Sequence, residues 1–322
     1  MAAALGTRRA RPPCCCPPLA PLTPAQRQRL ARALLWIVPL CWSSNYLIAR
    51  AAAGVIGAHS LALGRWSLAF GLMLPLAWRG LRQDGAPWLA AEWRQLLVLG
   101  GLGMWICGAF VYIGGQSTSS ANIGLIYAAT PVATAAAGVL LLHERMTRPQ
   151  MAGVALALAG VLFVIAKGDL RNLLAVRFTL GDAWIVAAGL SWTAYSLLLR
   201  LWPSRLGSAE RLVAITGGGI LVLLPFTALE WWWVAQPAFS LQALGLIVAA
   251  ALLPGIVAYQ AYSFMLRELG AGKTGLVLYL GPVYAAGTAW LLLGEPPQAF
   301  HAIGAALILP SIWLATRAPS PR

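Results

Sequence analysis

The chain has 322 residues, of which 60% are hydrophobic and only 10% are charged, and its formal net charge is +14. Soluble proteins carry about 25% charged residues, so this composition excludes a soluble protein of two ordinary domains. Apolar runs of the roughly 20 residues that cross a bilayer recur along the chain. The sequence therefore predicts an all-α integral membrane protein whose surroundings are the lipid bilayer.

A strongly basic chain can indicate a nucleic-acid partner. No basic stripe with interleaved aromatic residues is present here, and the Lys and Arg residues lie mainly in short loops and tails. Basic residues in such loops fix the orientation of membrane proteins. We therefore expect no nucleic acid among the partners.

Residues 1–33 are rich in arginine and proline and too poor in apolar residues to build a core, so we expect a disordered basic N-terminal tail. No apolar stretch with a cleavage site follows Arg8 and Arg9 before the first span, which argues against a signal peptide. Ten apolar segments follow, and each is predicted to be a transmembrane helix. Their approximate bounds are 34–52, 60–78, 95–114, 121–142, 149–166, 181–200, 210–229, 241–264, 272–293 and 299–316.

The basic residues are unequally divided between the two sides of these spans. With the N-terminus in the cytoplasm, eighteen Lys and Arg residues fall on the cytoplasmic side and four on the other, while Arg65 lies within a span. This excess is typical of cytoplasmic loops. We expect both termini in the cytoplasm and an even number of spans, although the basic loop 167–180 argues against that orientation.

An internal repeat organises the chain. Residues 121–165 align without a gap on residues 272–316 at an offset of 151, which places Pro131 on Pro282. At an offset of 150, Trp42 falls on Trp192. Such self-similarity indicates a duplicated architecture.

The repeat divides the chain into a first unit, 34–166, an inter-repeat loop, 167–180, a second unit, 181–316, and a C-terminal tail, 317–322. Each unit contains five predicted spans. Because five is odd, the second unit must enter the membrane in the opposite sense. The sequence thus predicts ten transmembrane helices as two inverted five-helix repeats, an arrangement that places a transport path between the repeats.

Several motifs occur in order in both units. The first spans carry WSSN at 42–45 and WTAY at 192–195, and Arg65 lies early in the second span. HERMTRPQMAG at 143–153 is echoed by GEPPQAFHAIG at 294–304. On these motifs the chain resembles the drug/metabolite transporter superfamily, EamA type, over nearly all of 34–316.

The resemblance implies a ten-helix fold in the cell inner membrane and export or exchange of small metabolites such as amino acids, drugs or sugars. The second copy of the last motif departs from the pattern. No basic residue follows Glu295, whereas Arg145 follows Glu144 in the first copy. The two glutamates therefore have different neighbours in the two copies.

Polar side chains within spans are costly unless they find partners, so they indicate candidate sites. Asn45 either bonds a neighbouring helix or binds a polar substrate. Arg65 either extends to the outer surface or pairs with an anionic group of the substrate.

Aromatic residues are the second group of candidates. Trp105, Ala109 and Tyr112 share one helix face by spacing, and the repeat places Tyr112 on Tyr262. They either line a central cavity or belong to an interfacial aromatic belt. The predicted substrate-binding residues are Asn45, Arg65, Trp42, Trp105, Tyr112, Tyr127, Trp192, Tyr195, Tyr259, Tyr262 and Tyr279.

Pro131 and Pro282 each remove a backbone donor within a span and should kink it. Small residues such as Gly138 allow close helix packing. We expect these three residues to form a hinge or packing element, although plain packing would explain them equally well.

No catalytic constellation is evident: His59, His143 and His301 lie near span ends, and no metal-ligand spacing occurs among the cysteines. We expect no enzyme activity, no metal and no cofactor. No Asp or Glu lies in the middle of a span, which favours facilitated diffusion or exchange over proton antiport.

The function predicted from the sequence is a secondary transporter that exports small metabolites, with amino acids as the favoured class, by alternating access. The alternatives are multidrug or cationic-compound efflux, and a membrane scaffold or receptor without transport. The expected partners are a small-molecule substrate and the bilayer, and the expected oligomeric state is a monomer.

Overall fold

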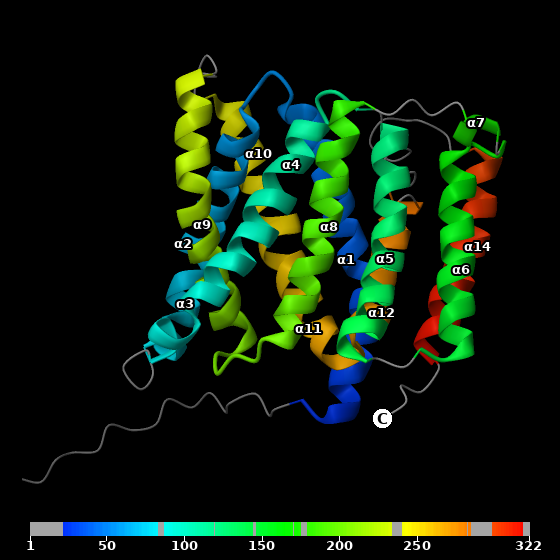
Figure 1. Ribbon diagram of the computed structural model, residues 1–322, viewed down its shortest axis with the longest axis horizontal. Coiled ribbons are helices and arrows are strands. Elements are labelled where there is room, and N and C mark those ends of the chain that lie inside the picture. The colour runs from blue at the N-terminus through cyan, green and yellow to red at the C-terminus, as the bar shows by residue number, and fades with distance from the viewer. Residues whose placement is uncertain are drawn as a thin grey trace, which may run out of the picture.

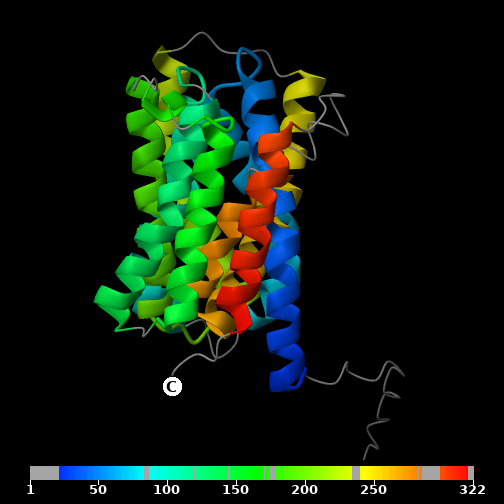
Figure 2. The ribbon, with the colours of Figure 1, turned by 90° about the vertical axis from the view of Figure 1, so that its right-hand side faces the viewer.

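A computed structural model describes residues 22–82, 87–118, 120–143, 146–169, 171–174, 179–233, 240–281, 283–284 and 298–317. Every regular element within these ranges is helical, and the long helices run side by side (Figures 1 and 2). In both views the start of α1 and the end of α14 lie at the same end of the molecule.

The elements follow the predicted order of apolar segments. Those up to residue 174 are α1 (Pro24–Ala52), α2 (Ala58–Leu81), α3 (Pro87–Gly100), η2 (Gly101–Ile106), α4 (Cys107–Gly114), α5 (Ser120–Leu142), α6 (Arg148–Ile165) and α7 (Arg171–Leu174). Those after it are α8 (Leu180–Leu201), α9 (Ser208–Trp233), α10 (Leu241–Ala250), η3 (Ala251–Val257), α11 (Ala258–Leu269), α12 (Ala271–Gly275), η4 (Leu276–Leu280) and α14 (Ala299–Arg317).

Five helical stretches are long and apolar enough to cross a membrane by length and composition. They are Ala58–Leu81, Ala90–Gly114, Leu180–Leu201, Ser208–Trp233 and Leu241–Leu269. Shorter apolar helices cover Thr130–Leu141, Arg148–Val164 and Ala299–Ser311. The chain is therefore a multi-pass membrane protein.

Helix α1 begins at Pro24, ten residues before the predicted first span, so it extends into the segment expected to be a disordered tail. The exposed residues 24–30 belong to its first turns. Arg27 of this stretch forms an ion pair with Glu268, with 2.7 Å between Nη2 and Oε1. The expectation of disorder is thus wrong for Pro24 onward, because a partner from α11 lies beside these turns, while residues 1–21 lie outside the described ranges.

One π-helical segment interrupts the third long helix in each half of the chain. One is η2, Gly101–Ile106, and the other is η3, Ala251–Val257. They begin 150 residues apart, which is the offset found in the sequence. A π-helix has more residues per turn than an α-helix and occurs often at functional sites. It therefore rotates the residues before it relative to those that follow.

The helices of the two repeats interleave and do not form two separate bundles. Helix α2 packs against α9, α6 against α14, and α4 against α8, while α11 packs against α1. Helix α5 packs against both α8 and α12. Each contact joins one repeat to the other, so a cavity in the centre is surrounded by residues of both.

Glycines allow the closest of these approaches. A Cβ at Gly100 would lie 2.2 Å from the backbone nitrogen of Gly219, and a Cβ at Gly219 would lie 2.6 Å from the Cβ of Met104. Neither neighbour is the end of a flexible side chain. The α3–η2 segment and α9 therefore pack backbone to backbone, a geometry that small residues permit in membranes.

Candidate functional site

A small cavity lies where the two repeats meet. Its volume is about 60 Å³. Six of the eleven predicted substrate-binding residues line it, with Cys107, Val111, Pro254 and Leu278, which sequence analysis did not single out. The six are Trp42, Asn45, Arg65, Tyr127, Trp192 and Tyr259.

A polar cluster from three helices lies at this cavity, and two of its three members, Asn45 and Arg65, line it. Arg65 of α2 donates from Nη1 to the hydroxyl oxygen of Tyr112 at 2.8 Å and to Oδ1 of Asn45 at 3.4 Å. The hydroxyl of Tyr112 in turn donates to Asn45 Oδ1 at 2.8 Å. We call Asn45, Arg65 and Tyr112 the polar triad. Asn45 therefore binds neighbouring helices, as its structural alternative predicted, and also lines the cavity.

Arg65 does not extend to the outer surface. Its relative exposure is 3%, and its guanidinium carbon lies 4.4 Å from the ring centroid of Trp66, a cation–π arrangement. Its Nε is buried without a hydrogen-bond partner in the described part of the chain. The ion pairs found there include none to Arg65. The charge is thus held inside the protein by neutral groups.

Aromatic rings form the rest of the site. Trp192 of α8 lies at its centre, with ring centroids at 5.2 Å from Trp42, 5.4 Å from Tyr195, 5.3 Å from Tyr259 and 4.7 Å from Tyr262. We call these five residues the aromatic cluster. Four of the five, all but the half-buried Trp42, are buried. Their position in the interior rules out an interfacial belt for this group.

Two tyrosine hydroxyls of α11 fix the cluster to its surroundings. Tyr259 donates to the carbonyl oxygen of Gly103 at 2.8 Å, within the π-helix η2. Tyr262 and Ser196 share a 2.8 Å hydrogen bond between their hydroxyls. Buried tyrosines need such partners, and here one partner is supplied by the irregular backbone of η2.

Two predicted residues lie elsewhere. Trp105 stacks on Phe226 with 3.8 Å between centroids and is not among the residues that line the cavity. It belongs to the π-helix η2, where the regular α-helical spacing assumed between Trp105 and Tyr112 does not apply. Tyr279 is buried in a separate apolar cluster with Val161 and Ile308, on the side of α6 and α14.

The predicted hinge residues are only partly described. Pro131 is buried within α5, which continues through it, and Gly138 is buried seven residues later on the same helix. A Cβ at Gly275 would lie 3.7 Å from the Cα of Pro131, so α12 packs beside this proline. Pro282 lies outside the described residues, as do Glu144, Arg145 and Glu295.

Sequence analysis also missed a contact between the repeats at the end where α2 begins. The carboxylate of Glu230 accepts from the backbone nitrogens of His59 at 2.9 Å and Ser60 at 2.8 Å, and from the Ser60 hydroxyl at 2.7 Å. His59 Nδ1 lies 3.2 Å from the same carboxylate. Trp231 Nε1 donates to Ser60 Oγ at 2.8 Å. A carboxylate at a helix N-terminus stabilises the unpaired N–H groups and the helix dipole.

No sequence signal could have revealed this contact, because Glu230 and Ser60 are 170 residues apart.

The polar triad and the aromatic cluster together offer hydrogen-bond donors, a buried positive charge and aromatic faces. Over the residues that the structure describes, no group of three or more His, Cys, Asp and Glu side chains could hold a metal ion. The arrangement is suited to holding a small molecule that has an anionic group and an apolar or flat body.

Comparisons with known proteins agree with this architecture. Residues 30–166 and 179–317 each match the EamA-like transporter family. An uncharacterized transporter of Archaeoglobus fulgidus is 24% identical over 284 residues, which cover 88% of this chain and 96% of the relative.

Two further relatives have more specific names. An S-adenosylmethionine/S-adenosylhomocysteine transporter of Chlamydia trachomatis serovar D is 24% identical over 85% of this chain and 86% of its own length. A protein of Streptantibioticus cattleyicolor named "Probable terminal-alkyne amino-acid exporter" is 25% identical over 90% of this chain and 95% of its own length.

A solved crystal structure superposes with a TM-score of 0.69 over 89% of this chain and 96% of its own, at 18% identity, which shows a shared fold. The family match covers both halves of the sequence, from the first turns of α1 to the end of α14. The chain therefore belongs to the EamA-like transporter family.

Proposed function

We propose that the protein is a secondary transporter that exports small metabolites such as amino acids by alternating access, with its substrate site at the polar triad and the aromatic cluster. One observation carries the proposal. Arg65 is buried on a cavity wall, bonded only to the neutral side chains of Tyr112 and Asn45 among the described residues. A buried charge without a counter-charge is costly, and an anionic group of a substrate would offset that cost.

The size of the cavity indicates which state the structure represents. About 60 Å³ is well below the roughly 300 Å³ at which pockets for drug-sized ligands begin. Within this proposal the structure is a closed state, and an amino acid enters only after the aromatic cluster separates. Alternating access requires such a state between the two open ones.

The inverted repeat is part of the proposal and has several supports. The π-helices η2 and η3 occur at equivalent positions. The packing pairs are reciprocal, because α4 on α8 is matched by α11 on α1, and α2 pairs with its own equivalent, α9. We further propose an inner-membrane location with both termini in the cytoplasm; the common end of α1 and α14 supports placing both termini on one side of the membrane.

The printed names of two relatives favour amino-acid-like substrates, since S-adenosylmethionine and a terminal-alkyne amino acid both carry an α-carboxylate. A carboxylate is a good partner for a guanidinium group. A substrate that is only cationic would meet the charge of Arg65 without a carboxylate nearby, which disfavours cationic efflux.

The test is counterflow in proteoliposomes that contain the purified protein. The panel comprises the twenty amino acids, S-adenosylmethionine, neutral sugars and cationic dyes. We expect accumulation of labelled amino acids or amino-acid derivatives in liposomes preloaded with the same compound. Accumulation of the cationic dyes alone would contradict the substrate class, and no accumulation of any compound would contradict transport by this site.

A further inference from the structure

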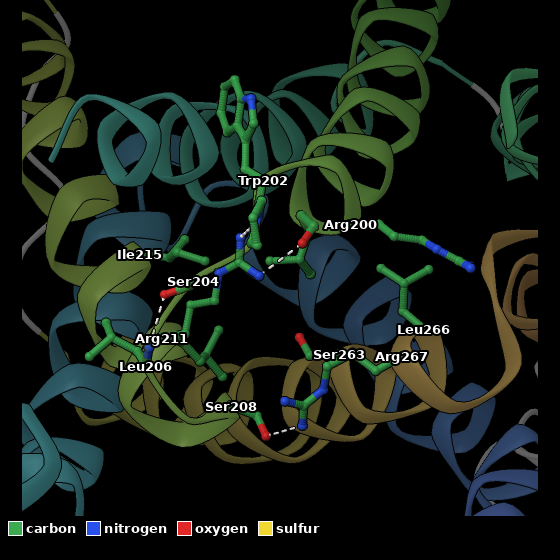
Figure 3. A pocket seen from close by; sticks show the side chains of 13 residues that line it. Arg200, Trp202, Ser204, Leu206, Ser208, Arg211, Ile215, Ser263, Leu266 and Arg267 are labelled. Atoms are coloured by element: carbon green, nitrogen blue, oxygen red, sulfur yellow. Dashed lines mark hydrogen bonds between the residues drawn. The ribbon is translucent and has the colours of Figure 1, made fainter. Parts of the chain in front are cut away.

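A second pocket lies at the end of the molecule where α1 begins, between the end of α8, the start of α9 and the end of α11 (Figure 3). Its volume is about 240 Å³. Three arginines and three serines line it, and none of its thirteen lining residues is acidic. The six polar residues are Arg200, Arg211, Arg267, Ser204, Ser208 and Ser263. We call this the inner basic pocket.

The three arginines differ in their role. Arg211 donates from Nη1 to the carbonyl of Leu199 at 2.8 Å and from Nη2 to the carbonyl of Trp202 at 2.5 Å, so it holds the C-terminal end of α8. Both carbonyls are neutral, and the carboxylate that acts on the charge of Arg211, that of Glu92, lies outside the pocket lining. Arg267 bonds to the Ser208 hydroxyl. Arg200 and Arg267 are exposed, which means that the pocket reaches the surface.

Two of the nearby carboxylates are bound to other groups, and a third, that of Glu210 beside Gly207, lies outside the pocket lining. Glu92 accepts from the Ser204 hydroxyl at 2.6 Å and from the backbone nitrogen of Arg205 at 3.3 Å. Glu268 is paired with Arg27 at 2.7 Å. The lining itself therefore presents guanidinium and hydroxyl donors, which is the set that recognises a carboxylate or phosphate group.

The inner basic pocket lies next to the aromatic cluster, one helical turn further along α8 and α11. Leu199 follows Tyr195 by four residues on α8, and Ser263 follows Tyr259 by four residues on α11. Residues four apart share a helix face and are separated by about 6 Å along the axis. The faces that build the aromatic cluster thus continue, one turn further, into the walls of the pocket.

We propose that the inner basic pocket binds the anionic group of a small metabolite at the inner mouth of the transport path, before the aromatic cluster opens. This rests on the proposed function, and it adds a second binding site and a charge preference to it. Arg65 lies beyond the aromatic cluster as seen from the pocket. The substrate's anionic group would therefore meet arginine side chains on both sides of the aromatic cluster, first in the inner basic pocket and then at Arg65.

A cysteine-modification assay tests the charge preference without any need for transport. Ser263→Cys is introduced after the five native cysteines have been replaced by alanine, and the protein is reconstituted in phosphatidylcholine liposomes. The rates of reaction with a sulfonate-bearing and a trimethylammonium-bearing methanethiosulfonate are each divided by the rate with free cysteine. We expect the anionic reagent to be favoured about tenfold, since clefts lined by one sign of charge raise local counter-ion concentrations by that order.

Arg200→Gln combined with Arg267→Gln should reduce this preference at least about threefold, because two of three charges are lost. Arg205→Gln is the matched control, since Arg205 lies on the loop between α8 and α9, is exposed and does not line the pocket; it should leave the preference unchanged. Equal rates for the two reagents, or an equal effect of the control, would overturn the proposal.

A protection experiment identifies the source of the anion. Succinate should slow the modification of Ser263→Cys in phosphatidylcholine liposomes, and choline chloride at the same ionic strength should not. Protection by phosphatidylglycerol in the liposomes but not by succinate would instead make this a lipid-headgroup site and overturn the proposal. If the Ser263→Cys protein shows the preference for the anionic reagent but the native protein shows no counterflow of any compound, the anion site is supported and the transport function is contradicted.

Discussion

The rings of Trp42 and Trp192 meet edge to face, with centroids 5.2 Å apart and planes at 89°. These two residues are equivalent in the internal repeat, at an offset of 150. Equivalent residues of two symmetry-related units can touch only close to the axis that relates them. The pair therefore supports a pseudo-twofold axis through the centre of the aromatic cluster, where a transport path between inverted repeats is expected.

The first prediction concerns Asn45. Its Oδ1 accepts from both Tyr112 and Arg65, so Asn45→Ala removes one acceptor from two buried donors. We expect counterflow to fall about tenfold, because hydrogen bonds to charged groups contribute about 1.5–3 kcal/mol. Asn172→Ala is the control. The Asn172 side chain donates to the Ala166 carbonyl, and neither residue lines the cavity. Equal flux in the two variants would remove Asn45 from the site.

The second prediction concerns the charge of Arg65. Arg65→Gln should lower the apparent affinity for anionic and zwitterionic substrates more than for cations, because only the former gain from a buried guanidinium. The measurement is the inhibition of counterflow by a set of amino acids and cationic dyes. Arg94→Gln, which changes an exposed arginine near Trp93, serves for comparison. A uniform loss for all compounds would assign Arg65 a structural role.

The third prediction separates the ring of Tyr262 from its hydroxyl. Tyr262→Ala removes contacts with Trp42 and Trp192 and should lower flux strongly while the protein still elutes as a single species. Tyr262→Phe keeps the ring and loses only the bond to Ser196, so its effect should be smaller, on the order of the 1 kcal/mol of one hydrogen bond. If both variants transported like the native protein, the aromatic cluster would not belong to the path.

The fourth prediction concerns helix packing. Gly100→Ala places a Cβ 2.2 Å from the Gly219 nitrogen and should destabilise the protein by about 1–3 kcal/mol, the usual cost of overpacking. Gly245→Ala is the matched control, because a Cβ there meets nothing within 4 Å and alanine favours helix by about 1 kcal/mol. Thermal unfolding in detergent measures both. Similar melting temperatures would mean that α3 and α9 do not pack this closely.

The fifth prediction concerns Glu230. Glu230→Gln removes the negative charge that caps α2 and should lower stability by about 1–2 kcal/mol, since the amide keeps part of the hydrogen bonding. The same unfolding experiment applies. Asp169→Asn provides the control, because Asp169 pairs with the highly exposed Arg171, and such surface pairs contribute little. An effect no larger than that of Asp169→Asn would contradict the capping role.

Much of the architecture follows from local patterns. Long apolar runs must be helical in a bilayer because every backbone N–H and C=O needs an internal partner. This constraint acts on each segment by itself, so apolar length predicted the helices well. The π-helices η2 and η3 begin 150 residues apart, which agrees with the offset found in the sequence.

Packing partners do not follow from such patterns. Trp105 was predicted to line the cavity by regular helical spacing, but it lies in a π-helix and stacks on Phe226, outside the cavity lining. Tyr279 was assigned to the cavity and is buried on the side of α6 and α14. In both cases side-chain direction depends on helix register and rotation, which are decided by neighbouring helices.

The sequence by itself determined that this chain is a duplicated helical membrane protein, because apolar length, charge placement and internal repetition can be read from the chain without its packing. Only the tertiary structure decided that the repeats interleave, that Asn45, Arg65 and Tyr112 meet, and that Glu230 caps α2. These contacts join residues up to 171 positions apart. They depend on how whole helices pack, which no single segment specifies.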